Sequence, residues 1–123
     1  MKGDDKILRN ESWLHLFCPY DWQIETEIRF KKNEEKKKIV PDVEFYDEEN
    51  IFHAVEVDRS QKMKVNEEKL KKYEEFMQIY KQKHNGEMPV IHFFTVTKYR
   101  EKKLEELAVK YDVFVKVYVI EEI

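Results

Sequence analysis

The chain has 123 residues, of which 41% are hydrophobic and 40% are charged, and its formal net charge at pH 7 is −3. This length suits one core and excludes two, so we expect a single domain over residues 1–123. Cys18 is the only cysteine, which excludes a disulfide framework and a cysteine-based zinc site and favours a reducing, cytoplasmic setting. No apolar run approaches the roughly 20 residues of a membrane span.

The N-terminal part of the chain predicts one helix, one strand and one loop. Residues 5–17 have an apolar side and predict a helix, and residues 18–21 (CPYD) predict a break after it. Apolar and polar side chains alternate over residues 22–30, which predicts a half-buried strand. The charged run over residues 31–38 predicts an exposed loop.

The remainder of the chain alternates between strand and helix patterns. Residues 40–46 and 51–58 are separated by a short acidic turn and predict an antiparallel hairpin. Two helices, each with an apolar stripe, are expected at residues 63–84 and 98–111. Two apolar strands are expected at residues 89–97 and 113–120. This order predicts an α/β fold, in which a mixed sheet made of the hairpin and a β-α-β-α-β unit is flanked by helices.

The predicted hairpin gathers carboxylates on one face. If residues 48–50 form a three-residue loop with Asn50 in the left-handed conformation, Asp42 lies directly opposite Glu56. Asp58 follows Glu56 by two residues and shares its face. A loop shifted by one residue would send Asp42 to the other face, so the cluster depends on this register.

Carboxylates held together repel one another unless a cation or a proton lies between them. Asp42, Glu56 and Asp58 therefore form a candidate site for a hard divalent cation, Mg²⁺ or Mn²⁺. Such an ion polarises a phosphodiester oxygen and lowers the pKa of a bound water. The alternative is that the hairpin carries surface carboxylates that pair with nearby cations such as Arg59 or Lys62.

At these residues the sequence resembles the PD-(D/E)xK nuclease superfamily. The match consists of Pro41 and Asp42 on one strand and residues 56–58 (EVD) on the next, in a hairpin-helix-strand-helix context. More narrowly, the chain resembles the replication-relaxation family of plasmid and phage proteins. The segments that carry this second resemblance are residues 40–42 (VPD), 55–59 (VEVDR) and 68–73 (EKLKKY).

The resemblance implies a restriction-endonuclease-like fold and a metal-dependent endonuclease or nickase that acts on the DNA of a mobile element. Asp42 and Glu56 would take the metal-ligand places. The lysine usually found two residues after the glutamate is replaced by Asp58, which would then serve as a ligand or as a general base. A lysine at the start of the following helix is expected to assist, and Lys62 and Lys64 are the candidates.

Two other hypotheses stay open. In the first, the chain is a catalytically inactive nuclease-fold module that binds DNA or binds a replication protein. In the second, it is an unrelated α/β interaction domain with an acidic surface hairpin. Members of the replication-relaxation family often carry a DNA-binding winged-helix segment ahead of this region, and we expect no room for one in these 123 residues. DNA targeting is therefore expected to need a partner protein or another surface. No membrane contact is expected, and cutting both strands of a duplex favours a homodimer.

Overall fold

The computed structural model describes residues 3–16 and 21–120. These residues form three helices, a five-stranded sheet and a separate two-stranded hairpin. The predicted end of the first helix at Phe17, the break at residues 18–20 and Cys18 lie outside the described residues. Within the described ranges, no helix is long and apolar enough to cross a membrane.

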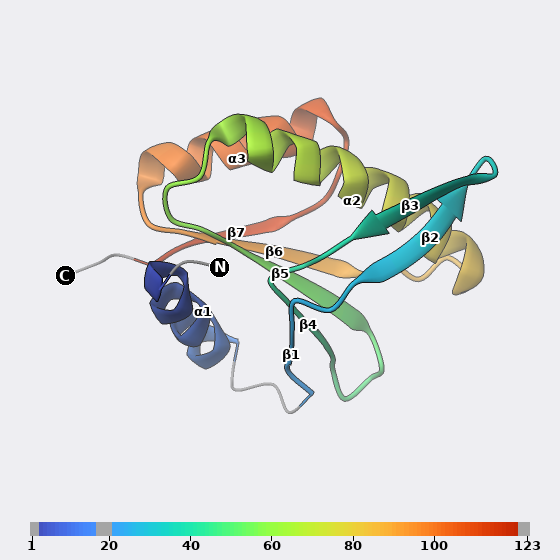
Figure 1. Ribbon diagram of the computed structural model, residues 1–123, viewed down its shortest axis with the longest axis horizontal. Helices are drawn as coiled ribbons and strands as arrows, with labels where there is room; N and C mark the ends of the chain where they lie inside the picture. Colours follow the sequence, from blue (N-terminus) through green and yellow to red (C-terminus); the bar gives the residue numbers. More distant parts are fainter. Residues whose placement is uncertain (1–2, 17–20, 121–123) are drawn as a thin grey trace.

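The sheet lies between two layers of helices (Figure 1). The helices α2 (Met63–Lys83) and α3 (Lys98–Lys110) cover one face, and α1 (Gly3–His15) lies on the other. The start of α3 follows a local sequence signal. Thr97 caps α3 by accepting a hydrogen bond from the backbone N–H of Arg100 at 3.1 Å.

The strand order in the sheet is β1-β4-β5-β6-β7. The bounds of these strands are Gln23–Ile24, Val43–Tyr46, Phe52–Asp58, Val90–Thr95 and Lys116–Val119. The pairs β1–β4 and β4–β5 are antiparallel, and the pairs β5–β6 and β6–β7 are parallel. The predicted mixed sheet, in which a hairpin leads into a β-α-β-α-β unit, is confirmed.

Alternation along the central strand β5 divides the core into two parts. Ala54 belongs to the cluster beneath α2 and α3, whereas Val55 belongs to the cluster that includes Leu8 of α1. Successive side chains of a strand point to opposite faces. Glu56 and Asp58 therefore point, like Ala54, toward α2 and α3.

The β4–β5 turn has the predicted geometry. Asn50 has a φ of 63°, in the left-handed region. Glu44 lies opposite Ala54 in the antiparallel ladder, as the three-residue loop requires. The predicted register is confirmed, and its continuation by one pair beyond β4 sets Asp42 across from Glu56.

The strand predicted over residues 22–30 is interrupted. β1 ends at Ile24, and the next residue, Glu25, has a φ of 52°. The chain then enters β2 (Ile28–Lys32), which belongs to a different sheet. A left-handed residue turns an extended chain out of its plane, so one alternating segment supplies strands to two sheets.

The charged run of residues 31–38 forms a β-hairpin, so the predicted loop is wrong. β2 pairs antiparallel with β3 (Glu35–Ile39) around Asn33 and Glu34, whose φ values of 52° and 68° suit a two-residue hairpin turn. The inner face of the hairpin packs on α2, where the rings of Phe30 and Phe76 lie 5.7 Å apart between centroids. This tertiary contact stabilises strands of low intrinsic β-propensity.

Candidate functional site

Asp42 lies at the residue just before β4 and follows the buried Pro41. Its Oδ2 accepts a hydrogen bond from the backbone N–H of Val57 at 2.8 Å. Because β4 begins only at Val43, this carboxylate takes the place of a strand acceptor for that N–H. Asp42 is half-buried, and its Oδ1 has no hydrogen-bond partner among the described residues. One carboxylate oxygen of the site is therefore open.

Glu56 is fully buried on the face that α2 covers. Its carboxylate accepts hydrogen bonds from Lys69 Nζ at 2.7 Å and from the hydroxyl of Tyr73. Burial raises the pKa of Glu56 from its usual 4.5 to about 7, the charge of Lys69 opposes this rise, and the charge of Asp42 adds to it. Glu56 therefore exchanges its proton near neutral pH.

Lys69 is the cation nearest to these carboxylates. Burial alone would lower the pKa of Lys69, but the negative charges of Glu56, Asp42 and Asp58 raise it above its usual 10.5. The lysine therefore stays protonated despite its partial burial. Lys69 therefore contacts Glu56 and also feels the charges of Asp42 and Asp58, so the four groups lie in one electrostatic cluster.

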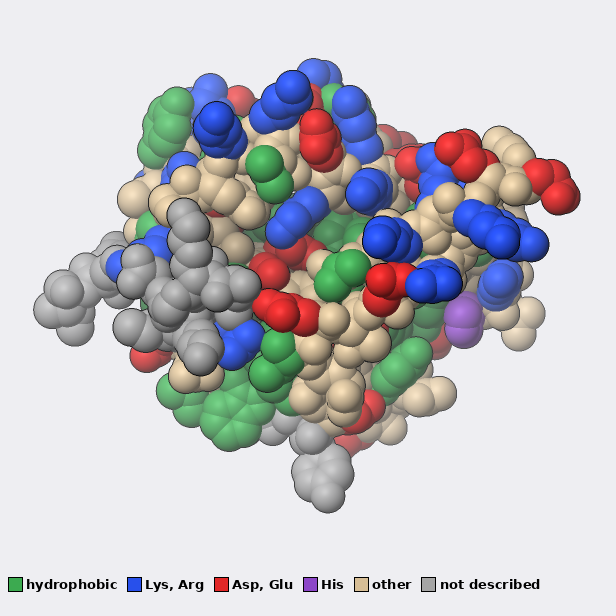
Figure 2. All heavy atoms as spheres, viewed as in Figure 1, with side chains coloured by type: hydrophobic (Ala, Val, Ile, Leu, Met, Phe, Trp, Pro, Cys, Tyr) green, Lys and Arg blue, Asp and Glu red, His purple; other side chains and the backbone are tan. Residues whose placement is uncertain are grey.

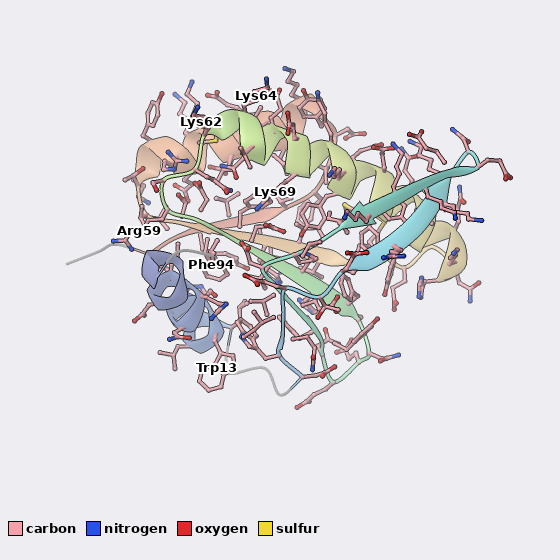
Figure 3. All side chains as sticks on the ribbon, viewed as in Figure 1. Trp13, Arg59, Lys62, Lys64, Lys69 and Phe94 are labelled. Atoms are coloured by element: carbon pink, nitrogen blue, oxygen red, sulfur yellow. The ribbon has the colours of Figure 1, made fainter. Side chains whose placement is uncertain are left out.

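The lysine that contacts Glu56 differs from the one predicted. Lys62 and Lys64 are exposed at the start of α2, and Figure 3 shows both on the side of the helix away from the sheet. Lys69 instead lies between α2 and the sheet. A signal for it exists in the sequence, because Lys69 and Tyr73 are four residues apart and so share one helix face.

Asp58 is fully buried and engaged with Arg100 of α3. Its Oδ1 accepts from Arg100 Nη2 at 2.7 Å, and its Oδ2 accepts from Arg100 Nε at 2.8 Å and from Thr95 Oγ1 at 2.9 Å. This two-point pairing neutralises the charge of Asp58 inside its own ion pair. The structure thus pairs Asp58 with a cation instead of leaving it free as a ligand or general base.

Two of the three predicted carboxylates, Asp42 and Glu56, lie opposite one another at the site, whereas Asp58 is paired with Arg100. Among the described residues, no group of three or more His, Cys, Asp or Glu side chains is arranged to hold a metal ion. With Asp58 neutralised by Arg100, Asp42 and ionised Glu56 share the single charge of Lys69. This leaves one uncompensated negative charge, and Asp42 Oδ1 is the one oxygen of the pair without a hydrogen bond from a described residue. A carboxylate oxygen of this kind is the ligand type that Mg²⁺ and Mn²⁺ prefer. In the view of Figure 2, acidic side chains lie near the centre of the molecule, below a band of Lys and Arg side chains over α2 and α3.

A second polar network lies on the other face of the sheet. His53 Nε2 contacts Asp47 Oδ2 at 2.8 Å, and His53 Nδ1 lies 2.9 Å from His92 Nε2. His92 Nδ1 in turn lies 3.0 Å from the hydroxyl of Tyr118. Burial lowers the pKa of His92 to about 3, so its ring is neutral. The network satisfies buried polar atoms of the core and contains none of the site carboxylates.

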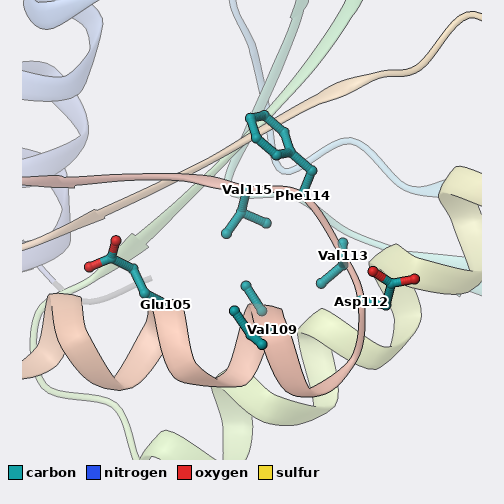
Figure 4. A pocket seen from close by; sticks show the side chains of 7 residues that line it. Glu105, Val109, Asp112, Val113, Phe114 and Val115 are labelled. Atoms are coloured by element: carbon teal, nitrogen blue, oxygen red, sulfur yellow. The ribbon is translucent and has the colours of Figure 1, made fainter.

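A surface pocket of about 360 Å³ lies between the end of α3 and the segment that leads into β7 (Figure 4). Its acidic lining residues are Glu105 and Asp112, and its apolar lining includes Val109 and Phe114. None of the site carboxylates lines this pocket. The candidate chemistry therefore lies at the sheet face under α2 and outside this pocket.

A family model described as Replication-relaxation matches residues 3–91, which is most of the chain. The matched segment contains Asp42, Glu56 and Lys69 and ends before Arg100. No curated protein matches the chain. On the extent of the family match, the chain belongs to the Replication-relaxation family.

Proposed function

We propose that the chain is a metal-dependent DNA endonuclease or nickase-like protein of a mobile element, in which Asp42 and Glu56 hold Mg²⁺ or Mn²⁺. The observation that carries the proposal is that Asp42, just before β4, lies opposite Glu56 of β5, with Lys69 bonded to Glu56 at 2.7 Å. Membership of the Replication-relaxation family supports a role in the replication or transfer of plasmid or phage DNA.

We assign the domain a restriction-endonuclease-like fold of the PD-(D/E)xK type. The order of elements supports this assignment, because an antiparallel hairpin is followed by a helix, a parallel strand and a second helix. Asp42 of the Pro-Asp motif lies at the start of the first hairpin strand, just before β4, and Glu56 of the Glu-x-Asp motif lies on β5. The departure is the lysine, which α2 supplies at Lys69 while Asp58 occupies its usual place.

The proposed reaction is hydrolysis of one phosphodiester bond. The oxygen of a water molecule bonds to phosphorus, the P–O ester bond breaks, and a proton from the water ends on the departing oxygen. A bound divalent cation would supply charge stabilisation for the phosphate in the transition state. Lys69 adds a fixed positive charge beside Glu56 and holds that carboxylate in place. Asp58 has a structural role here, because its hydrogen bonds with Arg100 tie the end of β5 to α3.

The first test is the nicking of supercoiled plasmid DNA in Mg²⁺ or Mn²⁺. Asp42→Asn and Glu56→Gln should each lower the nicking rate at least about a hundredfold, because each removes a cation ligand while keeping side-chain volume. Glu48→Gln is the matched control, because Glu48 is an exposed carboxylate in the turn of the same hairpin. Nicking that is insensitive to EDTA, or equal in all four proteins, would refute intrinsic catalysis by this site.

A second test separates Lys69 from the lysines at the start of α2. Lys69→Met should lower nicking by about a hundredfold, because loss of a positioned charge-stabilising group typically costs this much. Lys62→Met should change the rate less than about twofold, since Lys62 is exposed on the side of α2 away from the sheet. The midpoint of thermal unfolding, measured for both variants, identifies any loss that reflects unfolding. The reverse order of effects would place the assisting lysine at Lys62.

The second candidate function is a catalytically inactive nuclease-fold module that binds DNA or a replication protein. The observation that favours it is the pairing of Asp58 with Arg100, which removes the third carboxylate from the site. The nicking assay separates the two candidates, because the inactive module binds DNA without cleaving it in either metal.

A further inference from the structure

The hairpin β2–β3 concentrates positive charge in an acidic chain. Residues 29–38 contain six Lys or Arg residues and two Glu residues, so this segment carries a formal charge of +4 in a chain of net charge −3. Figure 1 shows the hairpin reaching out beyond the sheet on the right, beside the later turns of α2. Figure 2 shows Lys and Arg side chains along the same part of the molecule.

The two faces of this hairpin have different roles. The inner face is attached to α2, where Lys37 Nζ lies 2.6 Å and Lys32 Nζ lies 3.9 Å from Glu75 Oε2. The outer face carries four exposed cations at alternate positions of the two strands. We call these four residues the basic ribbon: Arg29, Lys31, Lys36 and Lys38.

The basic ribbon places like charges directly opposite one another. Arg29 pairs with Lys38, and Lys31 pairs with Lys36, across the antiparallel ladder. Glu27 lies 2.5 Å from Arg29 Nε and 3.9 Å from Lys38 Nζ, so the first pair has one acidic partner. Among the described residues, Lys31 and Lys36 form no ion pair. Like charges opposed across strands destabilise a sheet, so this pair opposes folding unless an external polyanion binds it.

We propose that the basic ribbon is the surface on which the protein binds duplex DNA. This proposal rests on the proposed function, because the choice of DNA as the bound polyanion follows from it. A two-stranded β-ribbon fits the major groove, and Lys and Arg side chains neutralise phosphates on its borders. Lys38 precedes Asp42 by four residues, so the two are at most about 14 Å apart along the chain. A duplex held on the ribbon therefore passes close to the candidate site.

The chemistry of the ribbon favours DNA over a lipid surface. All four of its side chains are charged, and it lacks the Trp, Phe or Leu side chains with which an interfacial element enters a bilayer. All four ribbon residues line a groove of about 670 Å³. Its lining also includes Glu27 and Lys83, and Lys83, from the last turn of α2, extends the basic surface. The positive surface thus continues from the hairpin to the end of α2.

The test measures binding of a fluorescein-labelled DNA duplex by fluorescence anisotropy in EDTA. Lys31→Gln/Lys36→Gln should weaken binding at least about tenfold at low salt and should reduce the slope of log affinity against log salt by about 2. The matched control, Lys72→Gln/Lys102→Gln, makes the same charge change at exposed positions of α2 and α3 and should alter affinity less than about twofold. The ribbon double variant should also show an equal or higher midpoint of thermal unfolding at low salt.

Several outcomes overturn the proposal. Equal weakening by the two double variants would mean diffuse attraction, and an unchanged salt slope would mean that the ribbon makes no phosphate contacts. Binding of the wild type to phosphatidylglycerol vesicles but not to DNA would assign the ribbon to a membrane surface. If the double variant unfolds, Lys36→Glu decides, because the introduced carboxylate pairs with Lys31, preserves the hairpin and should still weaken DNA binding. Binding is measured in EDTA, which prevents metal-dependent cleavage, and nicking is measured in Mg²⁺ or Mn²⁺. A failure of DNA binding is therefore distinguished from a failure of cleavage.

Discussion

Replacing Arg100 with methionine is expected to lower the free energy of unfolding by about 3 to 5 kcal/mol, because it leaves the carboxylate of Asp58 buried without its cation. Asp58 is fully buried, and two of its three hydrogen bonds from side chains come from Arg100. Thr95 alone cannot neutralise it. Urea unfolding at neutral pH, followed by circular dichroism, measures the effect.

The controls for Arg100→Met use the same ion pair and a neighbouring exposed lysine. Asp58→Asn should cost less, because the side chain of Arg100 is 20% exposed and water can solvate it. Lys98→Met, at the exposed first residue of α3, should change stability by less than about 0.5 kcal/mol. A loss below about 1 kcal/mol for Arg100→Met would contradict the buried pairing, since it would match a surface ion pair.

The free energy of unfolding is expected to fall by about 3 kcal/mol as the pH rises from about 4.5 to about 7, through Glu56 alone. The pKa of Glu56 is raised to about 7 in the folded protein by burial, whereas an unfolded chain releases this proton near its usual 4.5. The folded state therefore binds more protons across this window. The contribution is fully present below about pH 4.5 and is lost as the pH rises through about 7.

The measurement is the difference in unfolding free energy between the wild type and Glu56→Gln across this pH range. Glutamine does not titrate, so the wild type should lose stability relative to the variant as the pH rises. Glu48→Gln should run parallel to the wild type, because Glu48 is exposed in the β4–β5 turn. Parallel curves for Glu56→Gln would show that Glu56 titrates as an exposed carboxylate does. The same linkage predicts that affinity for Mn²⁺ rises up to about pH 7 and then levels off, because the cation requires ionised Glu56.

The residues that the sequence placed correctly are those governed by local geometry. Asn50 adopts the left-handed conformation that its turn requires, and this one residue sets the register that brings Asp42 across from Glu56. The helices that follow are predicted by their apolar stripes, and the structure places them at α2 and α3. Each of these features depends on side chains within a few positions of one another.

The basic hairpin was missed because its signal is mostly tertiary. Lysine has low β-propensity, and only Phe30 and Ile39 mark the inner face of an otherwise charged run. The hairpin forms because Phe30 packs on Phe76 and Lys37 bonds to Glu75. Phe76 and Glu75 belong to α2, a helix that begins more than twenty residues after the hairpin ends. The one local clue is Asn33, a residue that tolerates the positive φ of a hairpin turn.

By itself the sequence determined the mixed sheet, its hairpin register and the pairing of Asp42 with Glu56, because strand alternation and turn geometry act between near neighbours. Only the tertiary structure decided which cation each carboxylate receives. Lys69 reaches Glu56 because α2 packs over that face, and Arg100 reaches Asp58 from 42 residues further along the chain. A buried charge takes the partner that packing brings within hydrogen-bond distance, and sequence spacing does not encode that distance.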